Sequence, residues 1–265
     1  MEARPLISVL MGVYNCADTL EEAVQCMIDQ SYTNWELIMC DDCSTDNTLQ
    51  VALSLASKDS RIRVLRNEEN QTLAPTLNKC LDAARGEYIA RMDGDDICPP
   101  ERFEKELDFL ETHPEYALVS CQMNLFDKNG VYRIVSYKEI PAYADFVSRS
   151  QFCHAGCMMR TTVIKNLGGY CVDTKCQRVE DYDLWTRMYS AGYKGYNLQD
   201  PLYSMRDDRN AQKRRTFRNR VNESRVKLRV CRECKLPLKS YIHVAIPIVK
   251  WLMPAQLYGL AHKAK

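Results

Sequence analysis

Short apolar runs alternate with longer segments of helical periodicity over the first hundred residues of the chain. Each run is bounded by polar or turn-forming residues, which is typical of a buried strand. The predicted strands are residues 7–13, 35–40, 62–65 and 87–92, and the predicted helices between them are residues 18–30, 46–57 and 73–84. This alternation predicts an α/β fold with a mostly parallel sheet and helices on both of its faces.

Local signals refine these elements and extend the pattern to residue 191. Asp18 and Glu21 have the spacing of a capping box, and Asp46 is placed to cap the second helix. The later elements are a helix at residues 99–112 behind two prolines, strands at 116–122 and 131–137 with a turn at 129–130 between them, a strand-like run at 152–160, a turn at 167–170 and a helix at 180–191.

Polar clusters follow three of the predicted strands. Tyr14 and Asn15 leave the first strand, residues 41–46 (Asp-Asp-Cys-Ser-Thr-Asp) follow the second, and residues 93–96 (Asp-Gly-Asp-Asp) follow the fourth. In open parallel sheets, ligands bind beyond the carboxyl ends of the strands. We therefore expect the three clusters to meet on one rim of the sheet.

Asp93 and Asp95 are candidate ligands of a metal ion. Burying carboxylates is costly unless a cation compensates their charge, and a hard cation such as Mg²⁺ or Mn²⁺ prefers oxygen ligands. A solvated acidic turn is the plain alternative. An EF-hand loop is disfavoured because its sixth position, counted from Asp93, is Cys98 and not Gly. A phosphatase with Asp93 as nucleophile normally has Thr or Val where this chain has Ile97.

The net charge of +1 hides a strong asymmetry along the chain. Residues 206–265 hold 16 basic and 4 acidic side chains, whereas residues 1–205 hold 20 basic and 31 acidic ones. Residues 241–261 are apolar, but Pro247, Lys250 and Pro254 interrupt them, so no uncharged run reaches the ~18 residues that a spanning helix needs. We expect a domain at residues 1–205 and a basic helical tail at 206–265. The tail either docks on an anionic membrane surface or packs on the domain or a second copy.

Thirteen cysteines are scattered along the chain, and no secretory signal precedes the first predicted strand. A reduced, cytoplasmic protein is expected, peripheral on the inner face of the membrane if the tail docks. The two Cys-x-x-Cys spacings, at Cys40/Cys43 and Cys231/Cys234, would need to meet to hold zinc. Small, buried or partly exposed thiols are the simpler expectation.

The ordered set of motifs resembles the inverting family 2 glycosyltransferases, which have the GT-A fold. The resemblance covers roughly residues 6–200, and the basic tail is similar to that of members that assemble polysaccharides. The motifs that carry it are residues 9–15 (Val-Leu-Met-Gly-Val-Tyr-Asn), 41–48 (Asp-Asp-Cys-Ser-Thr-Asp-Asn-Thr), 84–89 (Ala-Arg-Gly-Glu-Tyr-Ile), 93–96 (Asp-Gly-Asp-Asp) and 180–185 (Glu-Asp-Tyr-Asp-Leu-Trp).

The resemblance implies roles for particular residues. Tyr14, with Asn15 beside it, would pack on the base of a nucleotide donor, and Asp42 would hydrogen-bond that base. Asp95 would bind the metal ion directly, with Asp93 nearer the ribose. Asp181 would be the catalytic base, although an acidic residue there could also simply complement a helix dipole. The chain departs from the family at Gly12 (often Pro), at Cys43 (often Gly) and at residues 204–209, where many members carry a metal-binding His.

The resemblance also implies the reaction. A sugar would move from a nucleotide-diphosphate donor, most often a uridine one in the family, to a hydroxyl acceptor, such as a lipid-linked saccharide in polysaccharide synthesis. A divalent ion neutralises the leaving group, one carboxylate deprotonates the acceptor, and a single displacement inverts the anomeric carbon. His154 and Arg160 could line the acceptor side or serve the core. The alternatives are a non-catalytic nucleotide-sugar-binding or membrane-docked scaffold and the phosphatase; no nucleic acid partner is expected.

Overall fold

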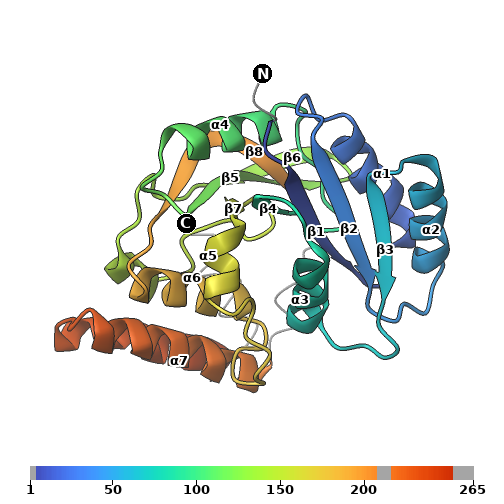
Figure 1. The fold of residues 1–265 in the computed structure, drawn as a ribbon. Coiled ribbons are helices and arrows are strands. Elements are labelled where there is room, and N and C mark those ends of the chain that lie inside the picture. The colour runs from blue at the N-terminus through green and yellow to red at the C-terminus, as the bar shows by residue number, and fades with distance from the viewer. Residues whose placement is uncertain (1–3, 208–215, 253–265) are drawn as a thin grey trace.

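A computed structural model describes residues 4–207 and 216–252 and contains one mixed sheet with helices on both faces (Figure 1). The strands are β1 (Ile7–Val13), β2 (Trp35–Asp41), β3 (Ile62–Arg66), β4 (Tyr88–Arg91), β5 (Leu118–Asp127), β6 (Gly130–Val135), β7 (Met158–Arg160) and β8 (Gly195–Arg206). The helices are α1 (Ala17–Ile28), α2 (Thr48–Lys58), α3 (Leu73–Ala83), α4 (Arg102–Thr112), α5 (Thr161–Asn166), α6 (Glu180–Ser190), α7 (Phe217–Glu233) and α8 (Ile242–Leu252), with short 3-10 turns η1 (Tyr143–Val147) and η3 (Leu238–Tyr241).

The strand order is β3-β2-β1-β4-β7-β5-β6, and β8 pairs with β5. Strands β1 to β4 are mutually parallel, as are β5 and β8, whereas β6 and β7 run antiparallel to their neighbours. The predicted α/β fold with a mostly parallel sheet is therefore confirmed. The carboxyl ends of β1, β2 and β4 lie on the same edge.

Two apolar clusters, one on each face of the sheet, follow the alternation of side chains along the strands. In β1, Val9 and Met11 join the cluster that α1, α2 and α4 complete, and Leu10 joins the cluster of α3, α5, α6 and α7. Successive side chains of a strand point to opposite faces, so one uninterrupted apolar run serves both clusters. This is why the parallel strands read as continuous hydrophobic runs in the sequence.

The predicted capping box at Asp18 is wrong. Helix α1 has Cys16 as its N-cap residue, and Asp18 lies within its first turn. The first amides of the helix are bonded from another loop: Thr48 Oγ1 accepts from Cys16 N at 2.8 Å, and Asp46 Oδ2 accepts from Ala17 N at 3.2 Å. Helix α2 begins at Thr48 with Asn47 as its N-cap residue, one position after the predicted Asp46; the Asp46 side chain nevertheless accepts from the first helical amide, that of Thr48, at 2.9 Å.

The strand predicted at residues 152–160 is too long, since only β7 at its end is extended. The chain bends before it, where Gly156 lies so close to Tyr203 that an added Cβ would be 2.8 Å from the Tyr203 Cβ. That tyrosine belongs to β8, a strand absent from the sequence prediction.

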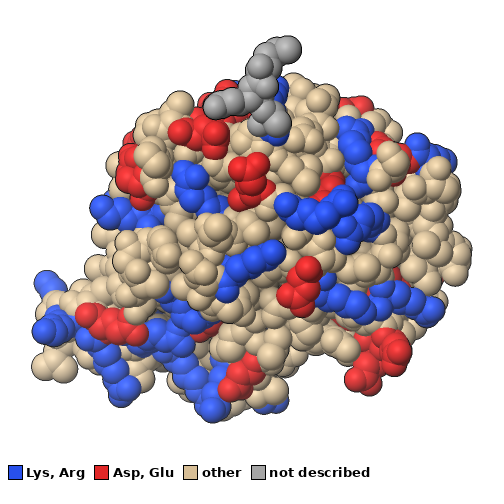
Figure 2. Space-filling view, viewed as in Figure 1, with Lys and Arg blue, Asp and Glu red and all other residues tan. Residues whose placement is uncertain are grey.

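The tail contributes a helix that packs on the body. Helix α7 lies along the edge of the molecule beside α6, and Lys and Arg side chains gather on its surface (Figures 1 and 2). Arg229 Nη1 donates to Asp183 Oδ1 at 2.8 Å, and Lys227 Nζ donates to the Ser148 carbonyl at 2.9 Å. Among the described residues, none of the helices has the length and apolar character needed to cross a membrane.

Candidate active site

A cavity of about 530 Å³ opens at the carboxyl ends of β1 and β2. Its walls are the end of β1 with Tyr14, the residue Asp42 after β2, residues 70–76 at the start of α3, and parts of residues 171–180 ahead of α6. Tyr14 is half exposed at its mouth. The structure thus brings together Tyr14 and Asp42, two of the predicted nucleotide-binding residues. Residues 70–76 and parts of residues 171–180, most of which lie outside the sequence motifs, complete the walls.

Asp42 is buried and holds one wall of this cavity in place. Its Oδ1 accepts from Asn67 Nδ2 and from the Gln71 amide, both at 2.8 Å, and its Oδ2 accepts from the Thr72 amide at 2.9 Å. Thr72 has a φ of 73°, a conformation costly for a side chain that branches at Cβ. The carboxylate therefore fixes a strained loop beside the place where a base would lie.

Asn15 joins the ends of β1 and β2. Its Oδ1 accepts from the Thr45 amide at 2.8 Å, and its own amide donates to Ser44 Oγ at 3.1 Å. Cys43, in the same turn, has a φ of 60°, which explains why a glycine is common at this position in the family that the sequence resembles. Asn15 thus orders the turn next to Tyr14, and its side-chain oxygen is already engaged.

The three carboxylates after β4 occupy different environments. Asp96 is buried, accepting from the Tyr203 hydroxyl at 2.8 Å and from the Arg206 amide at 2.7 Å. The Asp93 side chain is 35% exposed and Asp95 is exposed. Asp96 therefore ties β8 to the acidic turn, whereas Asp93 and Asp95 are accessible to a ligand.

The electrostatics of this turn suit a cation. Although Asp95 is exposed, the surrounding protein partly desolvates its carboxylate and raises its pKa, and the nearby charge of Asp93 raises that pKa further. Burial, followed by the charges of Asp93 and Asp95, raises the pKa of Asp96 to about 8. Neighbouring carboxylates oppose one another's ionisation, and a bound divalent ion relieves that repulsion. The oxygen donors of Asp93 and Asp95 fit a hard ion such as Mg²⁺ or Mn²⁺.

Arg206 occupies the end of β8, where the family that the sequence resembles often has a histidine. Its Nε donates to the Asp95 carbonyl at 2.9 Å, its guanidinium lies 4.6 Å from the ring centre of Phe126, and it pairs with Glu22. A guanidinium carries no lone pair for a metal ion. Arg206 therefore braces the acidic turn and is not a third metal ligand.

Asp181 lies in the first turn of α6 and is partly buried. Asp181 and Asp93, one of the carboxylates of the acidic turn, both act electrostatically on the buried Tyr170. Burial raises the pKa of the Tyr170 hydroxyl most strongly, with Cys157 next, and the charges of Asp181 and Asp93 both act in the same direction. The charges of the predicted base and of one predicted metal ligand thus act on the same buried tyrosine.

His154 and Arg160 have different surroundings. His154 Nε2 lies 3.0 Å from the Tyr170 hydroxyl, and burial followed by the charge of Arg91 lowers its pKa well below the usual range, so the ring is neutral. Arg160 is half-buried and donates to the carbonyls of Leu110 and Tyr116, so its role is structural. Of these two, only His154 supports the site.

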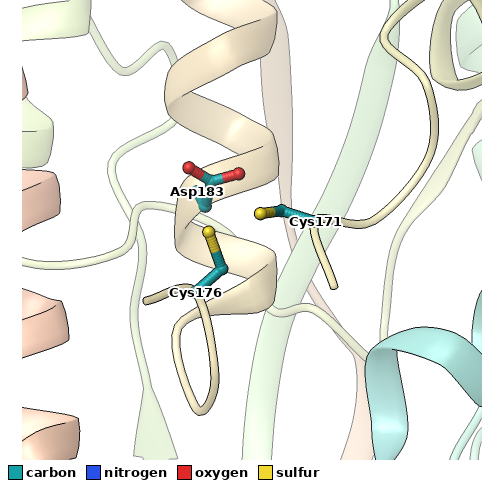
Figure 3. A group of neighbouring side chains, drawn as sticks. All are labelled: Cys171, Cys176 and Asp183. Atoms are coloured by element: carbon teal, nitrogen blue, oxygen red, sulfur yellow. The ribbon is translucent and has the colours of Figure 1, made fainter. Parts of the chain in front are cut away.

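Cys171, Cys176 and Asp183 form a separate group whose potential ligand atoms all lie within 4.8 Å of one another (Figure 3). Asp183 already accepts from Arg187 Nε at 2.7 Å and from Arg229 Nη1 at 2.8 Å, so an added cation would face two guanidinium groups. Burial, with Cys171 next, raises the pKa of Cys176 to about 12, which keeps its thiol protonated. The group joins loop, α6 and α7 and is a poor metal centre.

Comparisons with known proteins agree with this geometry. The model of the family described as "Glycosyl transferase family 2" matches residues 8–168. EpsE of Bacillus subtilis, which bears the name of a glycosyltransferase, is 42% identical over 266 residues, covering 100% of this chain and 96% of its own. WfaP of Escherichia coli, named as a UDP-Glc:α-D-GlcNAc-diphosphoundecaprenol β-1,3-glucosyltransferase, is 32% identical over 203 residues, covering 75% of this chain and 76% of its own.

A solved structure shares the fold at low sequence identity. The mannosyltransferase PcManGT of Pyrobaculum calidifontis, in complex with GDP-Man and Mn²⁺, superposes with a TM-score of 0.68 and 19% identity, covering 99% of this chain and 80% of its own. At that identity the likeness concerns the arrangement of the backbone.

Proposed function

The chain belongs to glycosyl transferase family 2, and on that premise we propose that it transfers a sugar from a nucleotide-diphosphate donor to a hydroxyl acceptor, with inversion and with the help of Mg²⁺ or Mn²⁺. One observation carries the proposal. The charges of Asp93 and Asp181 both act on the buried Tyr170, and Glu180, next to Asp181 at the start of α6, lines the same cavity as Tyr14 and Asp42.

Each residue has a chemical task in this scheme. Tyr14 packs on the base of the donor, and Asp42 keeps its wall of the cavity in shape while presenting carboxylate oxygen to that base. Asp95 and Asp93 hold the divalent ion, which when bound offsets the charge on the leaving diphosphate. Asp181 takes the proton of the attacking hydroxyl. The attack comes from the face opposite the leaving group, so a single displacement inverts the configuration.

We propose a uridine nucleotide as donor and a lipid-diphosphate-linked saccharide as acceptor. WfaP, whose name gives both UDP-Glc and a diphosphoundecaprenol-linked sugar, aligns over three quarters of the chain and supports both choices. PcManGT, with GDP-Man, has the same fold but lower identity. The acceptor proposal also agrees with the basic tail.

A thermal-shift panel of nucleotide sugars, each with and without Mn²⁺, tests the donor proposal. A ligand that binds the folded state stabilises it in proportion to the logarithm of its concentration over its Kd. One nucleotide sugar should raise the melting temperature, and only with the metal ion. Binding without release of nucleoside diphosphate would favour a non-catalytic scaffold. Release of phosphate from a generic phosphomonoester would favour a phosphatase.

We propose further that the basic tail predicted at residues 206–265 docks the protein on an anionic membrane surface through α8, whereas Arg206 and α7 pack on the body. Helix α8 exposes apolar side chains, with Ile242 64% and Leu252 67% exposed, and Trp251 adds an aromatic ring. Met253, Leu257, Tyr258 and Leu260, which the sequence also offers for this surface, lie outside the described residues. An amphipathic basic segment of this kind binds peripherally, with each Lys or Arg near the lipid contributing on the order of 1 kcal/mol.

A paired substitution on α8 tests the docking. Changing Trp251 and Leu252 together to Glu should lower binding to phosphatidylglycerol vesicles by ~10-fold or more, because it removes apolar contact and adds repulsion. The matched control changes Val131 and Ile134 to Glu, since these exposed residues lie on β6. The readout is cosedimentation at low and high salt. An unaltered chain that ignores the vesicles at low salt, or a dimer that the substitution dissociates, would show that α8 serves another contact.

A further inference from the structure

A buried arginine lies directly beneath the acidic turn. Arg91 is the last residue of β4, and its side chain is 1% exposed. Its Nη2 donates to Asp93 Oδ1 at 2.5 Å, and its Nη1 donates to the carbonyls of Leu10 at 3.3 Å and Met92 at 2.5 Å. The guanidinium is thus fixed to β1 and to the turn, and it faces one of the two Asp93 oxygens.

The charge of Arg91 is what distinguishes this contact from ordinary packing. A buried cation needs a partner of opposite charge, and among the described residues the ion pair of Arg91 is with Asp93. The other arginine buried nearby, Arg102, has its own buried partner, Glu106, at 3.1 Å. Arg102 Nη2 also donates to the Arg91 carbonyl at 2.9 Å, which holds the backbone of Arg91 in place.

The backbone of Asp93 is held as firmly as its side chain. Its amide donates to the Tyr203 hydroxyl at 3.2 Å, and that hydroxyl donates to Asp96 at 2.8 Å. The main chain is therefore anchored to β8, and the side chain is anchored to β4 through Arg91. Both anchors together leave Asp93 little freedom to rotate its carboxylate.

We propose that Arg91 is a positioning residue for the donor site, which occupies Asp93 Oδ1 and so turns the single oxygen Oδ2 toward the ligand. The inference rests on the proposed function, since it assumes that Asp93 serves a metal ion or a nucleotide. The two aspartates then bind the ligand differently. Asp93 offers one oxygen whose direction is fixed by Arg91, whereas Asp95, which has no such ion pair among the described residues, offers its whole carboxylate. Arg91 itself contacts neither the metal ion nor the nucleotide.

A double-mutant cycle separates positioning from general stabilisation. The variants are Arg91→Met, Asp93→Asn and the double variant, and the probes are Mn²⁺ alone, followed by its electron paramagnetic resonance signal, and Mn²⁺ with UDP or GDP. If Arg91 acts through Asp93, Arg91→Met weakens Mn²⁺-dependent binding by ~10-fold, the worth of a charge-assisted hydrogen bond. In the Asp93→Asn background the same change has less than ~2-fold effect, because residues that act as one unit are not additive.

Two further variants distinguish a specific loss of Mn²⁺ binding from a general loss of stability. Arg160→Met removes a partly buried arginine of β7, which lies in register with Tyr88 at the other end of β4 from Arg91. It should lower the melting temperature and leave Mn²⁺ binding unchanged. Arg91→Lys keeps the charge but loses the planar fork, so it should recover part of the binding.

The possible outcomes are distinct. Two outcomes overturn the positioning role. One is additive effects of the two substitutions on Mn²⁺ binding. The other is an Arg91→Met protein that binds Mn²⁺ as tightly as the unaltered chain or more tightly, which is the result expected if the substitution merely removes a positive charge near the cation. If the unaltered chain binds neither Mn²⁺ nor any nucleotide, the proposed function itself fails. In that case there is no binding to compare between the variants, and the proposed role of Arg91 fails together with the function on which it rests.

Discussion

Asp95→Asn is expected to lower sugar transfer by on the order of 10²-fold or more while the protein remains folded. Asp95 is exposed, so the amide should fit without disturbing the core. The loss follows because an amide presents a neutral oxygen where the ion needs a charged ligand. Release of nucleoside diphosphate at saturating Mn²⁺, with the melting temperature measured in parallel, checks this prediction.

Two controls make the Asp95 result specific. Asp108→Asn alters an exposed acidic residue on α4 and should leave both activity and stability unchanged. Raising the Mn²⁺ concentration should recover part of the donor binding that Asp95→Asn loses, since a weakened site fills at higher concentration of the ion. Full turnover in the presence of EDTA, or in Asp95→Asn itself, would remove the metal ion from the scheme.

Asp181→Asn is expected to keep donor binding and to lose sugar transfer by on the order of 10²-fold or more. The amide cannot take a proton from the attacking hydroxyl, whereas the cavity and the acidic turn are built from other residues. Titration with the nucleotide and Mn²⁺ measures binding, and product formation measures transfer. A fall in turnover at constant affinity for the donor is the signature of a lost base.

The alternative for Asp181 is that it only stabilises the start of α6. Asp183→Asn provides the comparison, because that buried carboxylate of α6 pairs with Arg187 on the same helix and with Arg229 on α7 and serves stability. Asp183→Asn should lower the melting temperature more than Asp181→Asn does, and reduce transfer less. If activity falls in proportion to stability in both variants, the role of Asp181 is structural.

The half of the fold that carries the site is readable from local sequence. Strands β1, β2 and β4 are buried on both faces, so each appears as a mainly apolar run, and the polar residues that follow them mark the binding edge. Strand β8 is not readable in this way. Its middle residues, 199–201, are exposed, and its register comes from distant pairing with β5. Such a strand lacks the alternation that a local pattern would show.

The sequence does not show which of the three carboxylates of the acidic turn are accessible, because their accessibility is decided by contacts with distant parts of the chain. Asp96 is withdrawn from solvent by Tyr203, which lies 107 positions further along the chain. Arg91 could have been noticed, because its position two residues before Asp93 suggests side chains on the same side of an extended segment.

The capping of α1 by Asp46 and Thr48 came likewise from a separate part of the chain, whereas the local spacing of Asp18 and Glu21 suggested a capping box that does not form.

The anomeric configuration of the product tests the central claim most directly. The enzyme is given Mn²⁺, the donor selected by the thermal-shift panel and a saccharide acceptor linked to a lipid diphosphate, and the new linkage is read by proton NMR. We expect the configuration opposite to that of the donor sugar, and on the order of 10²-fold less product or lower from Asp181→Asn under the same conditions. A linkage that retains the donor configuration, or full product formation by Asp181→Asn, would contradict it.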